Sequence, residues 1–172
     1  VSRANYQGDV GLHVARAIHG LLKNENLQEN GATIVEQSQN IGLAYVAGAT
    51  AYEENPEAKK EIDEINRKIY AKSDDKINGI YDWGFRVTMQ AFEDLYKLLG
   101  TKFDYYFLES QVADFGLGIV EENKKIFTES DGAVVFKADG YDPKLHTRVF
   151  KTSQGLPTYE TKELGLTVEK FK

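Results

Sequence analysis

The sequence predicts an α/β fold, and three patterns along its 172 residues support this class. The N-terminal stretch places a short strand candidate before a glycine-containing turn and an amphipathic run, an order typical of α/β proteins. Residues 41–99 carry apolar side chains at helical spacing. Beyond Gly100, aromatic and β-branched residues surround an Asp-Gly pair, which favours a β-hairpin. Helices and short strands are therefore expected in one domain-sized chain.

The N-terminal elements are expected in the order strand, turn, helix. Residues 1–6 are the strand candidate, and the helix should begin near Asp9 as its N-cap, because apolar residues recur every three or four positions from Leu12 to Leu22. Residues 23–40, including Glu29-Asn30-Gly31, are polar and rich in turn formers. We therefore expect a loop there.

Three more helices are expected before Gly100. The first covers 41–52, and the second begins at Pro56, since proline is favoured at the first helical position. The second helix has an apolar stripe made of Ile62, Ile65 and Ile69. The third runs from about Asp75 to Leu99, and Gly100 is a natural C-terminal cap. Trp83, within this helix, is expected in the core.

The C-terminal part should mix strands with helices. Strand propensity marks 103–108 and 148–151, and a hairpin is expected over 126–136, turning at Asp131-Gly132. A helix over 112–124 should be broken or loosened by Gly116 and Gly118. After a turn at 153–155, Pro157 should open a final helix that continues to about Lys172, and its uncapped end suggests a trimmed piece of a longer protein.

Composition excludes several functional classes. The chain holds 21 Lys and Arg against 27 Asp and Glu, so its formal charge of −6 argues against nucleic-acid binding by bulk electrostatics. It has no cysteine, which excludes disulfides, thiolate metal sites and thiol catalysis. No apolar stretch reaches membrane-spanning length, and the N-terminus does not resemble a signal peptide. A soluble cytoplasmic domain without membrane contact is expected.

Few residues suggest metal or acid–base chemistry. His13, His19 and His146 lack the spacing of a metal site, so no metal ligand is predicted. His19 and His146 are expected to be structural, whereas His13 follows the turn at Gly8 and stays open. This Gly-Asp-Val-Gly turn either contacts a phosphate or is a generic strand-to-helix turn. Glu109, Glu129 and Asp131 have the spacing of turns, so no catalytic acid or base is predicted.

Tyr159 and Glu163 are the strongest binding candidates. They lie four residues apart at the start of the last helix and so share one face. A phenol beside a carboxylate can hold a guanidinium, because the carboxylate pairs with its charge and the ring packs on it. An exposed helix pair of no function has the same spacing, so both interpretations stay open at this point.

Four segments together resemble the arginyl-tRNA synthetases. Segment 5–13 (Asn-Tyr-Gln-Gly-Asp-Val-Gly-Leu-His) is similar to the family's Asn-x-x-Gly-Asp-x-Gly stretch, which follows its ATP motif. Segment 98–104, with Glu109-Ser110, resembles its Leu-Gly-x-x-Phe-Asp and Glu-Ser stretch, and segment 129–134 its Asp-Gly-Ala hairpin. Segment 148–163 is similar to its Arg-Val-Leu-x-x-Ser-Asp-Gly-x-x-Thr-Tyr-x-Thr-x-Asp stretch. The four occur in family order and span the chain.

The sequence also departs from the family's pattern. Gln154 and Glu163 stand where the family has Asp, and Val10 stands where Trp is common. The His-x-Gly-His and Lys-Met-Ser-Lys-Ser-like motifs of class I synthetases are not among these 172 residues. The resemblance thus implies an internal fragment of a Rossmann-like catalytic domain. Residues 1–23 and 153–172 would be Rossmann-core elements, and 24–152 largely inserted helices and a hairpin.

The resemblance implies a part of arginine–tRNA ligase, which activates L-arginine with ATP and Mg and transfers it to tRNA(Arg). Tyr159 and Glu163 would bind arginine. The active-site turn would be built by four residues, Asn5, Gly8, Asp9 and His13. The fragment alone is expected to be an inactive monomer that binds no cofactor tightly and tRNA only feebly. The alternative is a stand-alone acidic, non-catalytic binding module, whose charge of −6 suits an arginine-rich partner.

Overall fold

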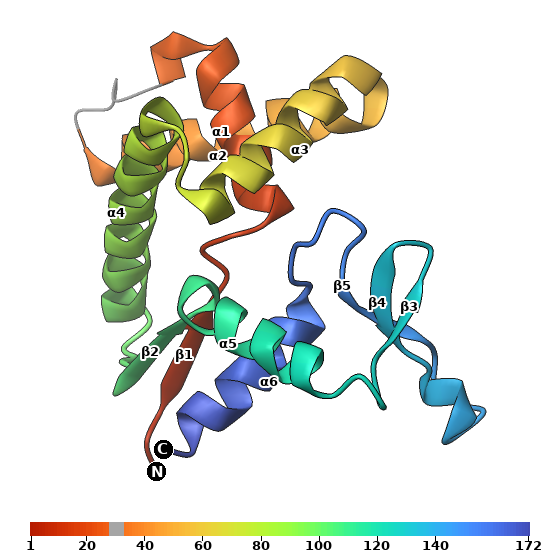
Figure 1. Ribbon diagram of the computed structural model, residues 1–172. Helices are drawn as coiled ribbons and strands as arrows, with labels where there is room; N and C mark the ends of the chain where they lie inside the picture. Colours follow the sequence, from red (N-terminus) through yellow and green to blue (C-terminus); the bar gives the residue numbers. More distant parts are fainter. Residues whose placement is uncertain (28–32) are drawn as a thin grey trace. The chain divides into compact units, whose positions relative to one another are not determined.

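The computed structural model describes residues 1–27 and 33–172, which form two compact units (Figure 1). The helical unit consists of Val1–Ala4 and Gly8–Tyr105, and the mixed unit consists of Asn5–Gln7 and Tyr106–Lys172. The chain therefore passes between the units at two short strands, β1 (Ala4–Gln7) and β2 (Tyr105–Leu108), which pair as a small parallel sheet.

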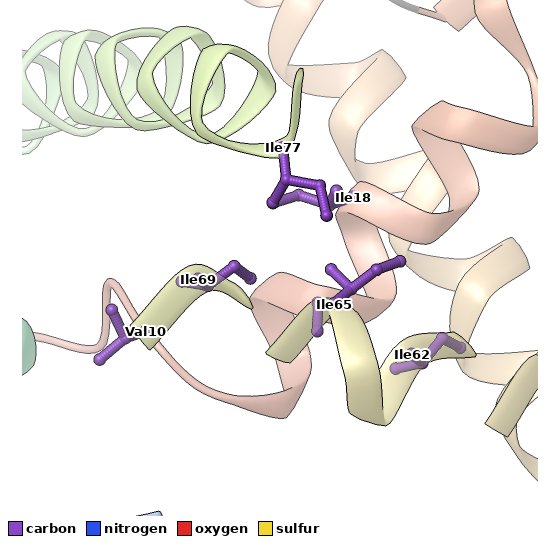
Figure 2. Close-up of a cluster of buried hydrophobic side chains, with 7 residues drawn as sticks. Val10, Ile18, Ile62, Ile65, Ile69 and Ile77 are labelled. Atoms are coloured by element: carbon purple, nitrogen blue, oxygen red, sulfur yellow. The ribbon is translucent and has the colours of Figure 1, made fainter. Parts of the chain in front are cut away.

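In its described residues the helical unit contains four α-helices, which are α1 (Leu12–Lys23), α2 (Ile34–Glu54), α3 (Pro56–Ala71) and α4 (Asp75–Leu98). A short 3-10 helix, Glu25–Leu27, follows α1. The larger core cluster of the helical unit contains Val10, Ala15, Ile18, Ile62, Ile65, Ile69 and Ile77, six of which are labelled in Figure 2. The apolar stripe predicted on the helix that begins at Pro56, which is α3, is thus confirmed. It faces α1 and the first turn of α4.

Local capping chemistry sets the ends of these helices. The Asn55 side chain accepts hydrogen bonds from the N–H groups of Glu57 and Ala58, and Pro56 takes the first position of α3 as predicted. Gly100 follows α4 with φ 65°, and its N–H donates to the carbonyl of Lys97. This left-handed glycine confirms the predicted stop.

Two expectations for the N-terminal part are wrong. Asp9 does not cap α1, which begins at Leu12 after Gly11; its buried carboxylate instead accepts a hydrogen bond from Tyr81 Oη at 3.1 Å. The prediction of a loop over 23–40 is wrong for the residues that the structure describes on either side of 28–32. Glu25–Leu27 is helical, and a capping box between Thr33 and Glu36 starts α2. The remainder of that loop, 28–32, lies outside the described residues.

The mixed unit contains a three-stranded antiparallel sheet in the order β3 (Thr128–Ser130), β4 (Ala133–Phe136) and β5 (Arg148–Lys151). Asp131 and Gly132 connect β3 to β4, with φ of 50° and 77°. Two consecutive left-handed residues are the signature of the type I′ turn that suits a hairpin. The hairpin and the 148–151 strand are therefore confirmed.

Helices α5 (Glu109–Glu122) and α6 (Tyr159–Lys170) pack on each other in this unit (Figure 1). A Cβ added to Gly116 would lie 2.0 Å from the carbonyl oxygen of Thr161, and one added to Gly165 would lie 2.2 Å from that of Val112. The expectation that glycine loosens α5 is therefore wrong at Gly116, because its missing side chain admits the backbone of α6. The final helix begins at Tyr159 rather than at Pro157, which forms a bridge to Lys151.

Across 1–27 and 33–172 the fold is mixed α/β and mostly helical, with one small parallel and one small antiparallel sheet. The coarse fold class predicted from the sequence is thus confirmed. Among the described residues, no helix has the length and apolar character needed to cross a membrane.

Candidate functional site

A groove of about 440 Å³ runs between the start of α6 and β5 in the mixed unit. Its lining residues are Arg148, Phe150, Tyr159, Glu160, Glu163, Leu164 and Thr167. Thr158 ties the two elements together, because its hydroxyl donates to the carbonyl of Val149 at 2.6 Å and its N–H to that of Phe150 at 3.0 Å. The hydroxyl of Thr161 donates to the same Phe150 carbonyl. These bonds hold the first turn of α6 beside the strand.

The structure brings Tyr159 and Glu163 together in this groove. Tyr159 Oη donates a hydrogen bond to the Glu163 carboxylate, and this bond, with the negative charge of Glu163, raises the pKa of the phenol above its ordinary value of 10.0. The spacing of four residues explains the contact, since it places both side chains on one face of α6. Tyr159 is 60% exposed, so its ring is open to a ligand in the groove.

The three carboxylates near Tyr159 differ in how their charge is balanced. Glu160 faces Arg148 at 3.9 Å, and Glu109 forms an ion pair with Lys162. Glu163 has no Lys, Arg or His within ion-pair distance among the residues that the structure describes, and its carboxylate lies beside the neutral Tyr159 hydroxyl. An unbalanced carboxylate beside an exposed aromatic ring can bind a cation, and a planar guanidinium suits both.

The residues of the predicted active-site turn fall in both units. Asn5 lies in β1 of the mixed unit, and Gly8, Asp9 and His13 belong to the helical unit. His13 is exposed, and its Nε2–H donates to the carbonyl of Gly8 at 3.0 Å, which closes the turn. The Asp9 carboxylate accepts the hydrogen bond of Tyr81, and burial and the Asp9 charge raise the pKa of that phenol.

The remaining sequence candidates have structural surroundings. His19 is buried, with Nε2 3.2 Å from Glu61 Oε2, and His146 is exposed. Trp83 lies in a core cluster with Leu21, Ala44 and Val87, as expected. Asp131 shapes the hairpin turn. Across 1–27 and 33–172, no group of three or more His, Asp or Glu side chains is arranged to hold a metal ion.

Sequence reasoning missed the charged neighbours of the groove. Arg148 and Glu160 lie in different elements, so no local spacing indicates that their side chains lie close together. Lys162 was not among the predicted site residues, although it is the buried ion-pair partner of Glu109. A cation directly beside a candidate ligand-binding carboxylate was the available signal.

Comparison with known proteins gives a consistent relationship. No protein-family model matches the chain. An arginine–tRNA ligase of Encephalitozoon cuniculi is 26% identical over 168 residues, covering 98% of this chain and 29% of that protein. One from Lactococcus lactis subsp. cremoris is 33% identical over 118 residues, covering 64% of this chain and 21% of its own length. The crystal structure of arginyl-tRNA synthetase from Plasmodium falciparum superposes on 98% of the chain with a TM-score of 0.65 at 17% identity.

These matches differ in what they establish. At 17% identity the structural match shows a shared fold, whereas the sequence matches extend across nearly the whole chain. The chain spans less than a third of the length of the curated relatives that it matches. It is homologous over nearly all its residues to the arginyl-tRNA synthetases, and it corresponds to about 27% of those enzymes.

Proposed function

We propose that this chain is part of an arginine–tRNA ligase and contributes the subsite that binds the side chain of L-arginine. The observation that carries the proposal is the Tyr159–Glu163 pair, where a carboxylate without a cationic partner among the described residues lines a groove. Homology to arginine–tRNA ligases supports the choice of ligand.

The groove offers arginine three kinds of contact. The Glu163 carboxylate can accept two hydrogen bonds from the guanidinium, and such charge-assisted bonds are about twice as strong as neutral ones. The Tyr159 ring supplies a face for the cation. Phe150 and Leu164 line the same groove and can pack against the methylene groups. A guanidinium on an aliphatic stem therefore matches the lining.

The parent enzyme's activity follows from the homology and is proposed here with it. That enzyme would activate L-arginine with ATP and transfer it to tRNA(Arg), with Asn5, Gly8, Asp9 and His13 building the turn near the aminoacyl site. Residues 1–23 and 153–172 would belong to its Rossmann core, and 24–152 would be largely inserted. None of these residues is proposed as an acid or base, since class I activation depends mostly on positioning and electrostatic stabilisation.

ATP and Mg are proposed for the parent and not for this chain by itself. Neither the His-x-Gly-His nor the Lys-Met-Ser-Lys-like motif is among the 172 residues, and no metal-holding group occurs in the described part. The fragment is proposed to be a cytoplasmic, inactive monomer that retains part of the arginine site.

Calorimetric titration of the 172-residue chain with L-arginine and L-citrulline tests this proposal. Citrulline keeps the length and planar end of arginine but is neutral there, so it isolates the charge that Glu163 would recognise. We expect weak arginine binding, with a Kd on the order of 1 mM, and no measurable citrulline binding. Equal affinity for the two, or no arginine binding, contradicts the proposal. Binding of arginine-rich peptides without free arginine would favour the acidic binding module.

A further inference from the structure

We infer that the ion pair between Glu109 and Lys162 is a positioning device, which sets the register of α6 against α5 and so holds Tyr159 and Glu163 in the groove. For the identity of the ligand, this inference rests on the proposed function. The positioning itself is a property of the two helices and can be tested without a ligand.

The pair lies at the interface of the two helices. Glu109 is the first residue of α5 and Lys162 the fourth of α6, and their side chains are only 10% and 6% exposed. Removing two charges from water costs several kcal/mol per ion, which their attraction repays only in a good geometry. Replacement of such a pair by apolar residues is often neutral for stability, so stability alone does not account for it.

Besides the ion pair, the two helices bury apolar residues such as Val112 and Leu166 and approach closely at two glycines. Gly116 meets the backbone of Thr161, and Gly165 meets that of Val112. Glycines let two helices approach closely, but they provide no side chain that interdigitates with the partner helix. A buried ion pair is directional, since its geometry fixes both the rotation and the axial position of the helix that carries it.

The position of Lys162 couples this register to the groove. It lies three residues after Tyr159 and directly before Glu163, so it turns with both on the same rigid helix. The Glu109 charge also acts on the Tyr159 phenol. A displacement of α6 that breaks the pair also strains the hydrogen bonds of Thr158 and Thr161 to β5. The ion pair therefore acts together with these bonds on the position of Tyr159 and Glu163 beside β5.

A charge-conserving double variant, Glu109→Gln with Lys162→Met, tests the inference. It removes one negative and one positive charge, so the net charge of the chain is unchanged. Glu57→Gln with Lys60→Met is the matched control, because that ion pair is 75% and 73% exposed and lies in α3. Lys162→Arg is the conservative rescue, and Glu109→Asp retracts the carboxylate by one methylene.

The readout is the set of NOEs between the Tyr159 ring and the side chains of Phe150 and Arg148, which line the same groove. They are measured in the 172-residue chain by NMR with ring-labelled tyrosine and assigned with Tyr159→Phe. In the double variant these NOEs should weaken, because α6 carries Tyr159 away from β5. Glu109→Asp should weaken them less. The Kd for L-arginine should rise at least about tenfold, because a displaced Glu163 loses a charge-assisted hydrogen bond to the guanidinium. The control and Lys162→Arg should leave both quantities unchanged.

Unchanged NOEs from Tyr159 to Phe150 and Arg148 in the folded double variant and in Glu109→Asp overturn the inference. If the double variant does not fold, Glu109→Asp decides alone. Weakened NOEs in a chain that binds no arginine support the positioning role and contradict the proposed function, so the two failures are distinguishable.

Discussion

At the scale of single residues, Glu163 is distinguished by its charge. Its neighbours Glu109 and Glu160 face cations, whereas no cation lies within ion-pair distance of Glu163 in the described part of the chain. Under the proposed function, Glu163→Gln should therefore weaken arginine binding by the chain and raise the arginine KM of the proposed full-length ligase. A hydrogen bond to a charged group contributes about 1.5–3 kcal/mol, which corresponds to roughly a 10- to 150-fold change.

The matched control is Glu169→Gln on the same helix. Glu169 pairs with Lys172 at the exposed end of α6 and lies outside the groove. Its substitution should leave arginine affinity unchanged, and thermal unfolding should show both variants folded. An unchanged KM in folded Glu163→Gln would make Glu163 a surface residue without a binding role.

Asp74 gives a residue-level prediction for pH. It caps α4 by accepting hydrogen bonds from the N–H groups of Lys76 and Ile77 at 3.1 Å. A hydrogen bond from Lys68 is the largest cause that lowers the pKa of Asp74 below 3.8, and the backbone hydrogen bonds contribute further. A lowered carboxyl pKa contributes stability above the unfolded value, and this is lost as the pH falls through the folded pKa. Asp74→Ala should therefore destabilise the chain at neutral pH.

The difference between wild type and Asp74→Ala should shrink as the pH falls below 3.8. Urea unfolding at a series of pH values measures it. Asp75→Ala is the control, because Asp75 is exposed in the same first turn and accepts no capping bond. A destabilisation by Asp74→Ala that persists unchanged in acid would assign the effect to hydrogen bonding by the neutral carboxyl group and not to its charge.

At the scale of elements, two glycines of α5 should respond oppositely to alanine. A Cβ on Gly116 would lie 2.0 Å from the Thr161 carbonyl oxygen, so Gly116→Ala must push α6 away and should cost about 1–3 kcal/mol. A Cβ on Gly118 would meet nothing within 4 Å, so Gly118→Ala should stabilise α5 by up to about 1 kcal/mol. Chemical denaturation of both variants measures the two signs. Equal effects would show that α6 does not press on Gly116.

At the scale of the whole chain, folding and catalysis should separate. The 172 residues should give a cooperative thermal transition but no arginine-dependent ATP–pyrophosphate exchange, because the donors that stabilise a reacting triphosphate in class I synthetases are not among them. A full-length arginyl-tRNA synthetase assayed in parallel is the positive control. Clear exchange by the chain would show that it is a compact enzyme.

Elements with strong local signals could be predicted from the sequence. Asn55, Pro56 and the isoleucine stripe specify α3, and Asp131-Gly132 specifies the hairpin. Both depend on contacts within a few residues, where hydrogen bonding and backbone sterics leave few alternatives. The Tyr159–Glu163 contact is of the same kind, since one helical turn produces it. The start of α2 also has a local sequence signal, the Thr33–Glu36 capping box. The polar composition of 23–40 favoured a loop there instead, so this helix start was not predicted.

The sequence by itself thus determined the α/β class, most strands and helices, and the pairing of Tyr159 with Glu163. Tertiary structure alone decided the partners of residues far apart in the chain: Asp9 with Tyr81, 72 positions away, and Glu109 with Lys162, 53 positions away. It also decided that Gly116 is a packing site. Charges and glycines carry no periodicity that names a distant partner, and a buried ion pair exists only where two helices pack closely enough to exclude water.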